Sequence, residues 1–256
     1  MTQQLSTTET LISDAQRSQF LENGFIRLDN VADETDLAWY RAQYARLFSG
    51  EVAGSNHKNL GGSDAAGRNV LPQILGASKT MPELLERNYF HRITEIAKFI
   101  LGPEAAFRAD HMILKPAGYG ATTPWHQDQA YHDSAYRYTN INFWMPLDAV
   151  TVEGGCMQYV RQTHKGTLLP HEFLIPGDNQ SAMVAQDQDF WSANATALPC
   201  PGGSVCLHHS YCMHYAGPNR TENPRRAYII VFGLPPVPVE SPFVLPWQDD
   251  PSRRLN

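Results

Sequence analysis

The sequence lacks the features that mark several large classes of protein. It has only four cysteines, with no CxxC pair or regular spacing, which is typical of reduced thiols in an intracellular protein. It has no dense run of lysine and arginine and a net charge of −6, so neither nucleic acid nor an anionic membrane is expected as a partner. No apolar run approaches the roughly 20 residues that cross a bilayer, and the polar N-terminus does not resemble a signal peptide. We therefore expect a cytoplasmic protein.

Length and composition predict one globular domain over residues 1–256. Hydrophobic residues make up 42% of the chain and charged residues 18%, values that are ordinary for a globular enzyme. Residues 1–13 are expected to form a flexible tail. Local patterns after this tail predict a capped helix from Ser13 to Gly24, a strand over Phe25–Val31, a helix from Glu34, and an interrupted helical region over Pro82–Leu101.

The second half of the chain consists of short strand-like runs divided by glycine and proline. Strands are predicted over His111–Lys115, Thr123–Ala130, Asn140–Val150, Cys156–Val160, Gly203–His209 and Arg225–Leu234. Short strands without long helices between them favour a sandwich or barrel over a parallel α/β sheet. We predict a mainly β fold with flanking helices, a double-stranded β-helix with the N-terminal helices packed outside.

Residues 50–80 are rich in small and polar residues and show little periodicity. Such a long stretch in a compact enzyme is usually a lid or a disordered segment. We interpret it as a lid that becomes ordered over bound substrate, with a passive connector as the alternative.

The most informative motif is Trp125-His126-Gln127-Asp128. On a β-strand, side chains at i and i+2 project from the same face, so His126 and Asp128 could bind one ion together. Two imidazoles and one carboxylate on one face of an octahedral ion form the facial triad of non-heme Fe(II) oxygenases. The motif therefore predicts two ligands of an iron site.

A third ligand must come from another strand, and three histidines are candidates: His208, His209 and His214. The first two lie in a strand-like run, where a histidine is more often a packed core residue. His214 precedes the turn signal Gly217-Pro218-Asn219 and lies eleven residues before Arg225. Residues at that distance can lie on neighbouring antiparallel strands, which would place a metal and an arginine at the two ends of a small dicarboxylate. We therefore choose His214.

Arg225 and Arg226 begin the last predicted strand. A 2-oxo dicarboxylic acid chelates Fe(II) at one end and needs a fixed cation for its far carboxylate. The planar guanidinium of arginine suits this role because it binds a carboxylate with two parallel hydrogen bonds. Strand alternation points one arginine inward and the other into solvent, and we expect Arg225 to be the inward one.

Several blocks together resemble the phytanoyl-CoA dioxygenase family over roughly residues 15–235. They are His126-Gln127-Asp128, Asn142 to Asp148, Glu153 to Met157, Thr163 to Gly166, and His214 to Arg220 with Arg225-Arg226-Ala227. The resemblance implies an Fe(II)- and 2-oxoglutarate-dependent oxygenase on a double-stranded β-helix, with O2 as the oxidant. It assigns iron to His126, Asp128 and His214, and the 2-oxoglutarate salt bridge to Arg225.

The resemblance also suggests cosubstrate contacts for Gln127 and Trp144. A regular strand would point Gln127 away from the metal, and His111 is either a pocket residue or a core histidine. Aromatic Tyr131, Tyr136, Tyr138 and Phe143, with His132, are candidate substrate-pocket walls, with ordinary packing as the alternative for each.

The chain keeps Asp128, whereas halogenating relatives replace that carboxylate, so hydroxylation-type chemistry on a small metabolite is expected. Succinate and CO2 would be released, and the protein would act as a monomer or homodimer. Two alternatives remain at this point: a cupin-like metalloenzyme that does not use 2-oxoglutarate, and a catalytically silent binding protein on the same fold.

Overall fold

The computed structural model describes residues 11–178, 180–242 and 245. Two antiparallel sheets form its centre, and the helices lie outside them. The larger sheet has the strand order β1 (Phe25–Leu28), β12 (Val205–His209), β7 (Asn140–Pro146), β14 (Arg225–Gly233), β4 (Ala106–Lys115), β3 (Pro72–Leu75) and β2 (Asn56–Asn59). The smaller sheet has the order β11 (Thr196–Leu198), β8 (Met157–Tyr159), β13 (His214–Ala216) and β5 (Thr123–His126). Two facing sheets of this kind confirm the predicted double-stranded β-helix.

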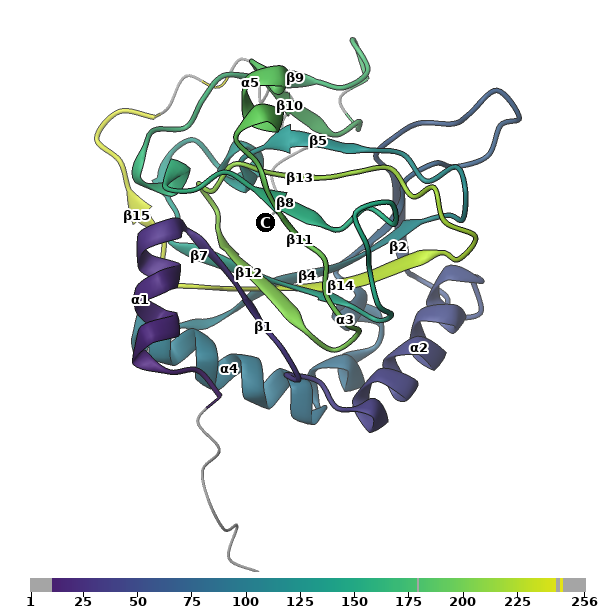
Figure 1. The fold of residues 1–256 in the computed structure, drawn as a ribbon, viewed down its shortest axis with the longest axis horizontal. Helices are drawn as coiled ribbons and strands as arrows, with labels where there is room; N and C mark the ends of the chain where they lie inside the picture. The colour runs from purple at the N-terminus through teal and green to yellow at the C-terminus, as the bar shows by residue number, and fades with distance from the viewer. Residues whose placement is uncertain (1–10, 179, 243–244, 246–256) are drawn as a thin grey trace, which may run out of the picture.

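Helices α2 (Glu34–Phe48) and α4 (Asn88–Leu101) run along the outer face of the larger sheet, and the smaller sheet lies on its other side (Figure 1). Helix α1 (Asp14–Asn23) precedes β1 and has the predicted capping box at Ser13. The remaining helical segments are α3 (Ala77–Thr80), α5 (Gln188–Ala193), and the 3-10 turns η1 (Pro82–Leu85), η2 (Asp128–Tyr131) and η3 (Thr163–Lys165). In the described part of the chain, no helix is long and apolar enough to cross a membrane.

Strand alternation separates a helix-facing core from a core between the two sheets. Phe143, Met145 and Tyr228 point outward and pack with α2 and α4, whereas Trp144 and Ile229 point inward, between the sheets. Residues that stand opposite one another in an antiparallel pair share a face, so the pairing of Trp144 with Ile229 keeps both on the inner side. Phe143 therefore belongs to the helix-facing core, and its interpretation as a pocket wall was wrong.

The prediction of an unstructured stretch over residues 50–80 was also wrong. This stretch contains β2, β3 and α3, and β3 extends the larger sheet by pairing with β4. Ile74 is fully buried against the outer core, which explains why a strand forms where the polar composition suggested a loop. The parts without a helix or strand are residues 50–55 and the connection between β2 and β3, in which Ser63 and Asn69 form an isolated β-bridge. The predicted tail, residues 1–13, lies mostly outside the described residues.

Other boundaries moved by a few residues. The strand predicted over Thr123–Ala130 ends at His126, because the chain turns into η2 at Asp128. The strand predicted to reach Val31 ends at Leu28, and Asn30 then adopts a positive φ of 60°. Two small two-stranded sheets were not predicted: β9 (His171–Phe173) with β10 (Met183–Ala185), and β6 (Tyr136–Arg137) with β15 (Val237–Pro238).

Candidate metal and cosubstrate site

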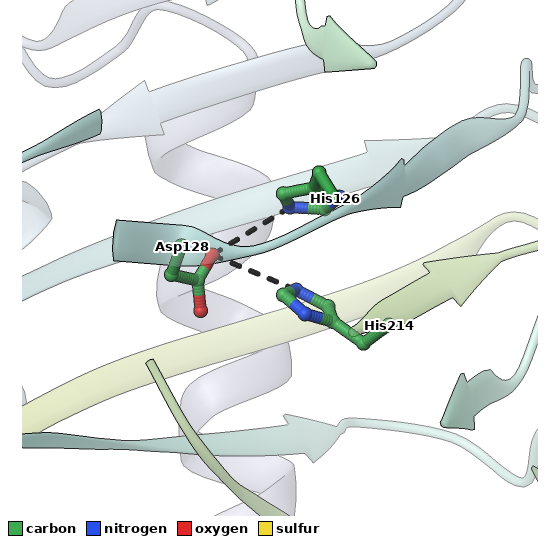
Figure 2. Close-up of side chains that lie close together, drawn as sticks. All are labelled: His126, Asp128 and His214. Carbon is green, nitrogen blue, oxygen red and sulfur yellow. Dashed lines mark ion pairs between the residues drawn. The ribbon is translucent and has the colours of Figure 1, made fainter. Parts of the chain in front are cut away.

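His126 and His214 stand opposite each other on neighbouring strands of the smaller sheet. Strands β5 and β13 are antiparallel, their register pairs these two residues, and the imidazole centroids are 4.1 Å apart. Asp128 joins them from the start of η2, with its Oδ1 atom 3.5 Å from the Nε2 atom of each histidine (Figure 2). One ligand atom from each residue lies within 4.8 Å of the others. The expected trio is therefore assembled, although Asp128 reaches it from a turn and not from a strand.

Backbone carbonyl groups orient both imidazoles. The Nδ1 atom of His126 lies 2.7 Å from the Pro124 carbonyl oxygen, and that of His214 lies 2.9 Å from the Cys212 carbonyl oxygen. A carbonyl only accepts, so each Nδ1 carries a proton, and Nε2 is the ring nitrogen left to bind a metal. Burial, followed by the nearby His126, holds the pKa of His214 well below its usual value. A neutral imidazole is the form that binds a metal.

The carboxylate of Asp128 is ionised and held at one oxygen. Its burial opposes ionisation, but His214, His126 and His208 together keep the pKa of Asp128 well below its usual value. The Oδ2 atom accepts hydrogen bonds from Asn142 Nδ2 at 2.7 Å and from His208 Nε2 at 3.0 Å. The other oxygen, Oδ1, faces His126 and His214. Two imidazole Nε2 atoms and one carboxylate oxygen fit Fe(II) in a facial triad.

A cavity of about 60 Å³ connects this trio with the predicted cosubstrate residues. Its walls include His111, Ile113, Thr123, Asn142, Trp144, Met157, His208, Ala216, Arg225 and Ile229, together with the trio itself. Trp144 is 3% exposed, and the Arg225 guanidinium lies over its ring, 5.5 Å from the centroid. The ring therefore helps to fix the position of the guanidinium.

Arg225 is the inward arginine, as the alternation predicted. It is buried, and within the described residues its Nε and Nη1 atoms have no hydrogen-bond partner. Burial lowers the pKa of Arg225 to about 10, so the side chain keeps its charge at neutral pH. Arg226 points the other way and pairs with Asp148 at 2.8 Å. A buried cation with unused donors fits the far carboxylate of a dicarboxylic acid.

Gln127 and His111 differ in their relation to the cavity. Gln127 is not among the cavity walls: its Nε2 donates to the Thr167 and Tyr211 carbonyls, and its Oε1 accepts from Leu169 N–H. The side chain ties together two loops behind the metal ligands, which agrees with the strand geometry that points it away. His111 does line the cavity, and burial lowers its pKa.

Of the remaining aromatic wall candidates, Tyr131 lies against a metal-ligand residue, and His132, Tyr136 and Tyr138 pack on one another. Tyr131 meets the His126 ring edge-on at 5.9 Å, His132 stacks on Tyr138 at 4.5 Å, and Tyr136 lies edge-on to Tyr138 at 6.3 Å.

Three residues near the site were missed or given no role. His208 was expected to be an ordinary core histidine, but it lines the cavity and binds Asp128. Asn142 was part of a motif without a role. Lys115 is fully buried, and its Nζ donates to the Ala216 and Gly217 carbonyls at 2.7 and 2.6 Å. Alternation in β4 places Lys115 on the same face as His111, which was the available signal for its burial.

Comparison with known proteins finds relatives over most of the chain. The family model for phytanoyl-CoA dioxygenase (PhyH) matches residues 20–227. The peroxisomal phytanoyl-CoA dioxygenase of Mus musculus is 26% identical over 240 residues, which cover 90% of this chain and 71% of that protein. The crystal structure of EvdO2 from Micromonospora carbonacea var. aurantiaca, complexed with 2-oxoglutarate, is 38% identical with a TM-score of 0.81, covering 93% of this chain and 98% of that one. EctD from S. alaskensis shares the fold, with a TM-score of 0.69 and 18% sequence identity. The match covers 89% of this chain and 78% of the EctD chain.

Proposed function

The chain belongs to the phytanoyl-CoA dioxygenase family and is a non-heme iron- and 2-oxoglutarate-dependent dioxygenase, and we propose that His126, Asp128 and His214 hold its iron while Arg225 binds 2-oxoglutarate. The observation that carries this assignment is one shared cavity. It has three convergent metal-ligand side chains at one place on its wall and a buried arginine with unused donors at another. A metal-chelating oxo acid with a second carboxylate needs both.

When bound, iron and 2-oxoglutarate together supply the activation of O2, with release of succinate and CO2 and oxidation of a substrate C–H bond. The protein supplies the rest. His126 and His214 each present an Nε2 atom, Asp128 presents one oxygen, and Arg225 fixes the far end of the cosubstrate. Apolar walls such as Met157 and Ile229 exclude water from the reacting atoms.

The substrate we propose is a small metabolite, and hydroxylation is the expected outcome. Desaturation, epimerisation or ring rearrangement would need the same iron site and a different placement of the substrate carbon. A CoA thioester carries several phosphates, and no dense run of basic residues occurs in the sequence to hold them. We expect the protein to be cytoplasmic and to act as a monomer or homodimer.

Arg225 argues against the first alternative, a cupin-like enzyme that works without 2-oxoglutarate. Within the described residues, two nitrogens of its buried guanidinium have no hydrogen-bond partner, which is costly, and a carboxylate ligand would offset that cost. The ordered metal ligands argue against a silent binding protein, because the hydrogen bonds on both imidazoles and on Asp128 serve a metal centre rather than the stability of an empty pocket.

The decisive experiment measures succinate formation in the presence of Fe(II), O2 and 2-oxoglutarate, with a panel of small metabolites as substrates. We expect stimulation by the true substrate and loss of turnover in His126→Ala and His214→Ala. His91→Ala is the matched control, because His91 is an exposed histidine on α4. Full succinate formation by His214→Ala would refute the iron assignment, and succinate formation that does not require O2 would refute the reaction class.

A further inference from the structure

His208 has a position that the iron and cosubstrate roles do not explain. It lies on β12, is 3% exposed, and faces the space between the sheets beside its register partner Asn142. Its imidazole centroid is only 4.2 Å from that of His214. Its Nε2 atom is nevertheless directed at Asp128 Oδ2, 3.0 Å away, and not at the gap between the metal-ligand atoms.

The two oxygens of Asp128 have different surroundings. Oδ1 faces His126 and His214, and Figure 2 shows the second oxygen pointing away from both imidazoles. That second oxygen, Oδ2, receives hydrogen bonds from His208 and Asn142. An ionised carboxylate can only accept, so His208 carries a proton on Nε2. Asp128 is therefore fixed with one oxygen engaged and the other available.

Tyr159 contacts the other ring nitrogen of His208. Its hydroxyl lies 3.1 Å from His208 Nδ1, and the ring stacks on Phe25 with 4.7 Å between centroids. Burial raises the pKa of Tyr159 well above its usual value, so the hydroxyl keeps its proton and can donate to Nδ1. A neutral His208 that accepts at Nδ1 and donates at Nε2 satisfies both neighbours. The result is a buried hydrogen-bond chain from Tyr159 through His208 to Asp128.

We propose that His208 is a positioning residue that restricts Asp128 to binding the metal through Oδ1 alone; this inference rests on the proposed function. A free carboxylate can bind a metal through one oxygen or through both. If Oδ2 turned toward the metal, its buried hydrogen bonds with His208 and Asn142 would both be broken. Because these hydrogen bonds keep Oδ2 away from the metal, a further coordination position would remain open for 2-oxoglutarate or O2.

The rival interpretation makes His208 a fourth protein ligand. The hydrogen bonds at both of its nitrogens argue against this, since Nε2 would have to abandon Asp128 to reach a metal. The trio whose ligand atoms lie within 4.8 Å of one another also forms without it.

The test compares His208→Gln with His208→Met in the full-length protein. The two replacements have similar size and flexibility, but only glutamine can donate a hydrogen bond to Asp128. Co(II), which does not turn over with O2 as Fe(II) does, is the metal probe. We would measure its affinity by calorimetry, its coordination by visible absorption, and the 2-oxoglutarate affinity of the Co(II)-loaded protein.

Removing a partner that orients a metal ligand typically weakens metal affinity about 10- to 100-fold, and we expect a loss in that range for His208→Met. We also expect an altered Co(II) spectrum and weaker 2-oxoglutarate binding. His208→Gln should recover most of the affinity and the wild-type spectrum. Tyr159→Phe, which removes one hydroxyl, should give a smaller loss in the same direction.

His209→Met is the matched control, because His209 is the adjacent histidine but does not line the cavity. Equal Co(II) and 2-oxoglutarate affinities in the glutamine and methionine variants would overturn the positioning role. If the Co(II) spectra showed that both variants have one nitrogen ligand fewer than the wild-type protein, His208 would be a fourth metal ligand and the positioning role would be overturned. If the wild-type protein bound Co(II) but not 2-oxoglutarate, the proposed function would be refuted. The positioning role of His208 would still be tested by the Co(II) affinities of the variants.

Discussion

Arg225 and Lys115 stand directly opposite each other on β14 and β4, and both basic side chains are buried. Lys115 is satisfied by the carbonyls of Ala216 and Gly217, so it connects β4 of the larger sheet to the end of β13 in the smaller one. Burial and the nearby Arg225 hold the pKa of Lys115 well below its usual value. Lys115 therefore links the two sheets, whereas Nε and Nη1 of Arg225 have no hydrogen-bond partner among the described residues, as the proposed 2-oxoglutarate site requires.

The first prediction separates the two adjacent arginines. Arg225→Ala should weaken 2-oxoglutarate binding to the Co(II)-loaded protein, because a hydrogen bond to a charged group contributes about 1.5–3 kcal/mol, or roughly 10- to 100-fold in affinity. Arg226→Ala removes only a partly exposed pair with Asp148, worth about 0–1 kcal/mol in stability, and should leave the affinity unchanged. Calorimetric titration measures both. The reverse order would place the cosubstrate on the other face of β14.

The second prediction concerns acid stability and His171. Its Nε2 accepts from Gln127 N–H and its Nδ1 lies against the Leu169 carbonyl, so the folded protein holds a neutral ring. Burial lowers the pKa of His171 to about 4 from an ordinary value of 6.5. Between pH 6.5 and about pH 4, His171 is protonated in the unfolded chain but not in the folded protein. The free energy of unfolding should therefore fall as the pH falls from about 6.5 to 4, by up to about 1.4 kcal/mol per pH unit.

Urea unfolding of the metal-free protein at pH 7 and pH 5 measures this loss. His171→Gln is the comparison, since a glutamine can accept from Gln127 N–H and donate to the Leu169 carbonyl without titrating. The variant should lose less stability over the same pH interval. Equal losses in the two proteins would show that His171 is not responsible.

The third prediction concerns the type of product. The chain keeps the carboxylate of Asp128, which halogenating relatives replace, so the wild-type protein should add oxygen to its substrate or remove two hydrogens. Mass spectrometry of reactions run with and without chloride or bromide checks this. Halogenated product would contradict the chemistry while leaving the fold intact.

The fourth prediction narrows the lid hypothesis to the connection between β2 and β3. Amides of β3 should exchange slowly in every state, because Ile74 is fully buried and the strand is paired with β4. Residues 61–69, which are largely exposed, should gain protection when Co(II), 2-oxoglutarate and substrate are bound. Hydrogen exchange with and without these ligands provides the measurement. Unchanged rates in residues 61–69 would make the segment a passive connector.

The sequence by itself determined the chemistry of the site and the phase of its strands. His126, Asp128 and His214 could be chosen because few residue types bind iron and because turn signals and the eleven-residue distance to Arg225 restrict their placement. Alternation selected Arg225 over Arg226, since a period of two is fixed by the geometry of the extended chain. The two-sheet fold followed from short strands and frequent turns.

Only the tertiary structure decided how these residues are held. The hydrogen bonds from Asn142 and His208 to Asp128 join segments that are far apart in the chain, and no local pattern encodes such pairings. The strand β3 forms because it pairs with β4 and buries Ile74 in the helix-facing core, which outweighs a weak local preference. Burial of Lys115 likewise depends on carbonyls of the opposite sheet. Sequence periodicity fixes which side of a strand a residue faces, whereas the partner that it meets there depends on long-range packing.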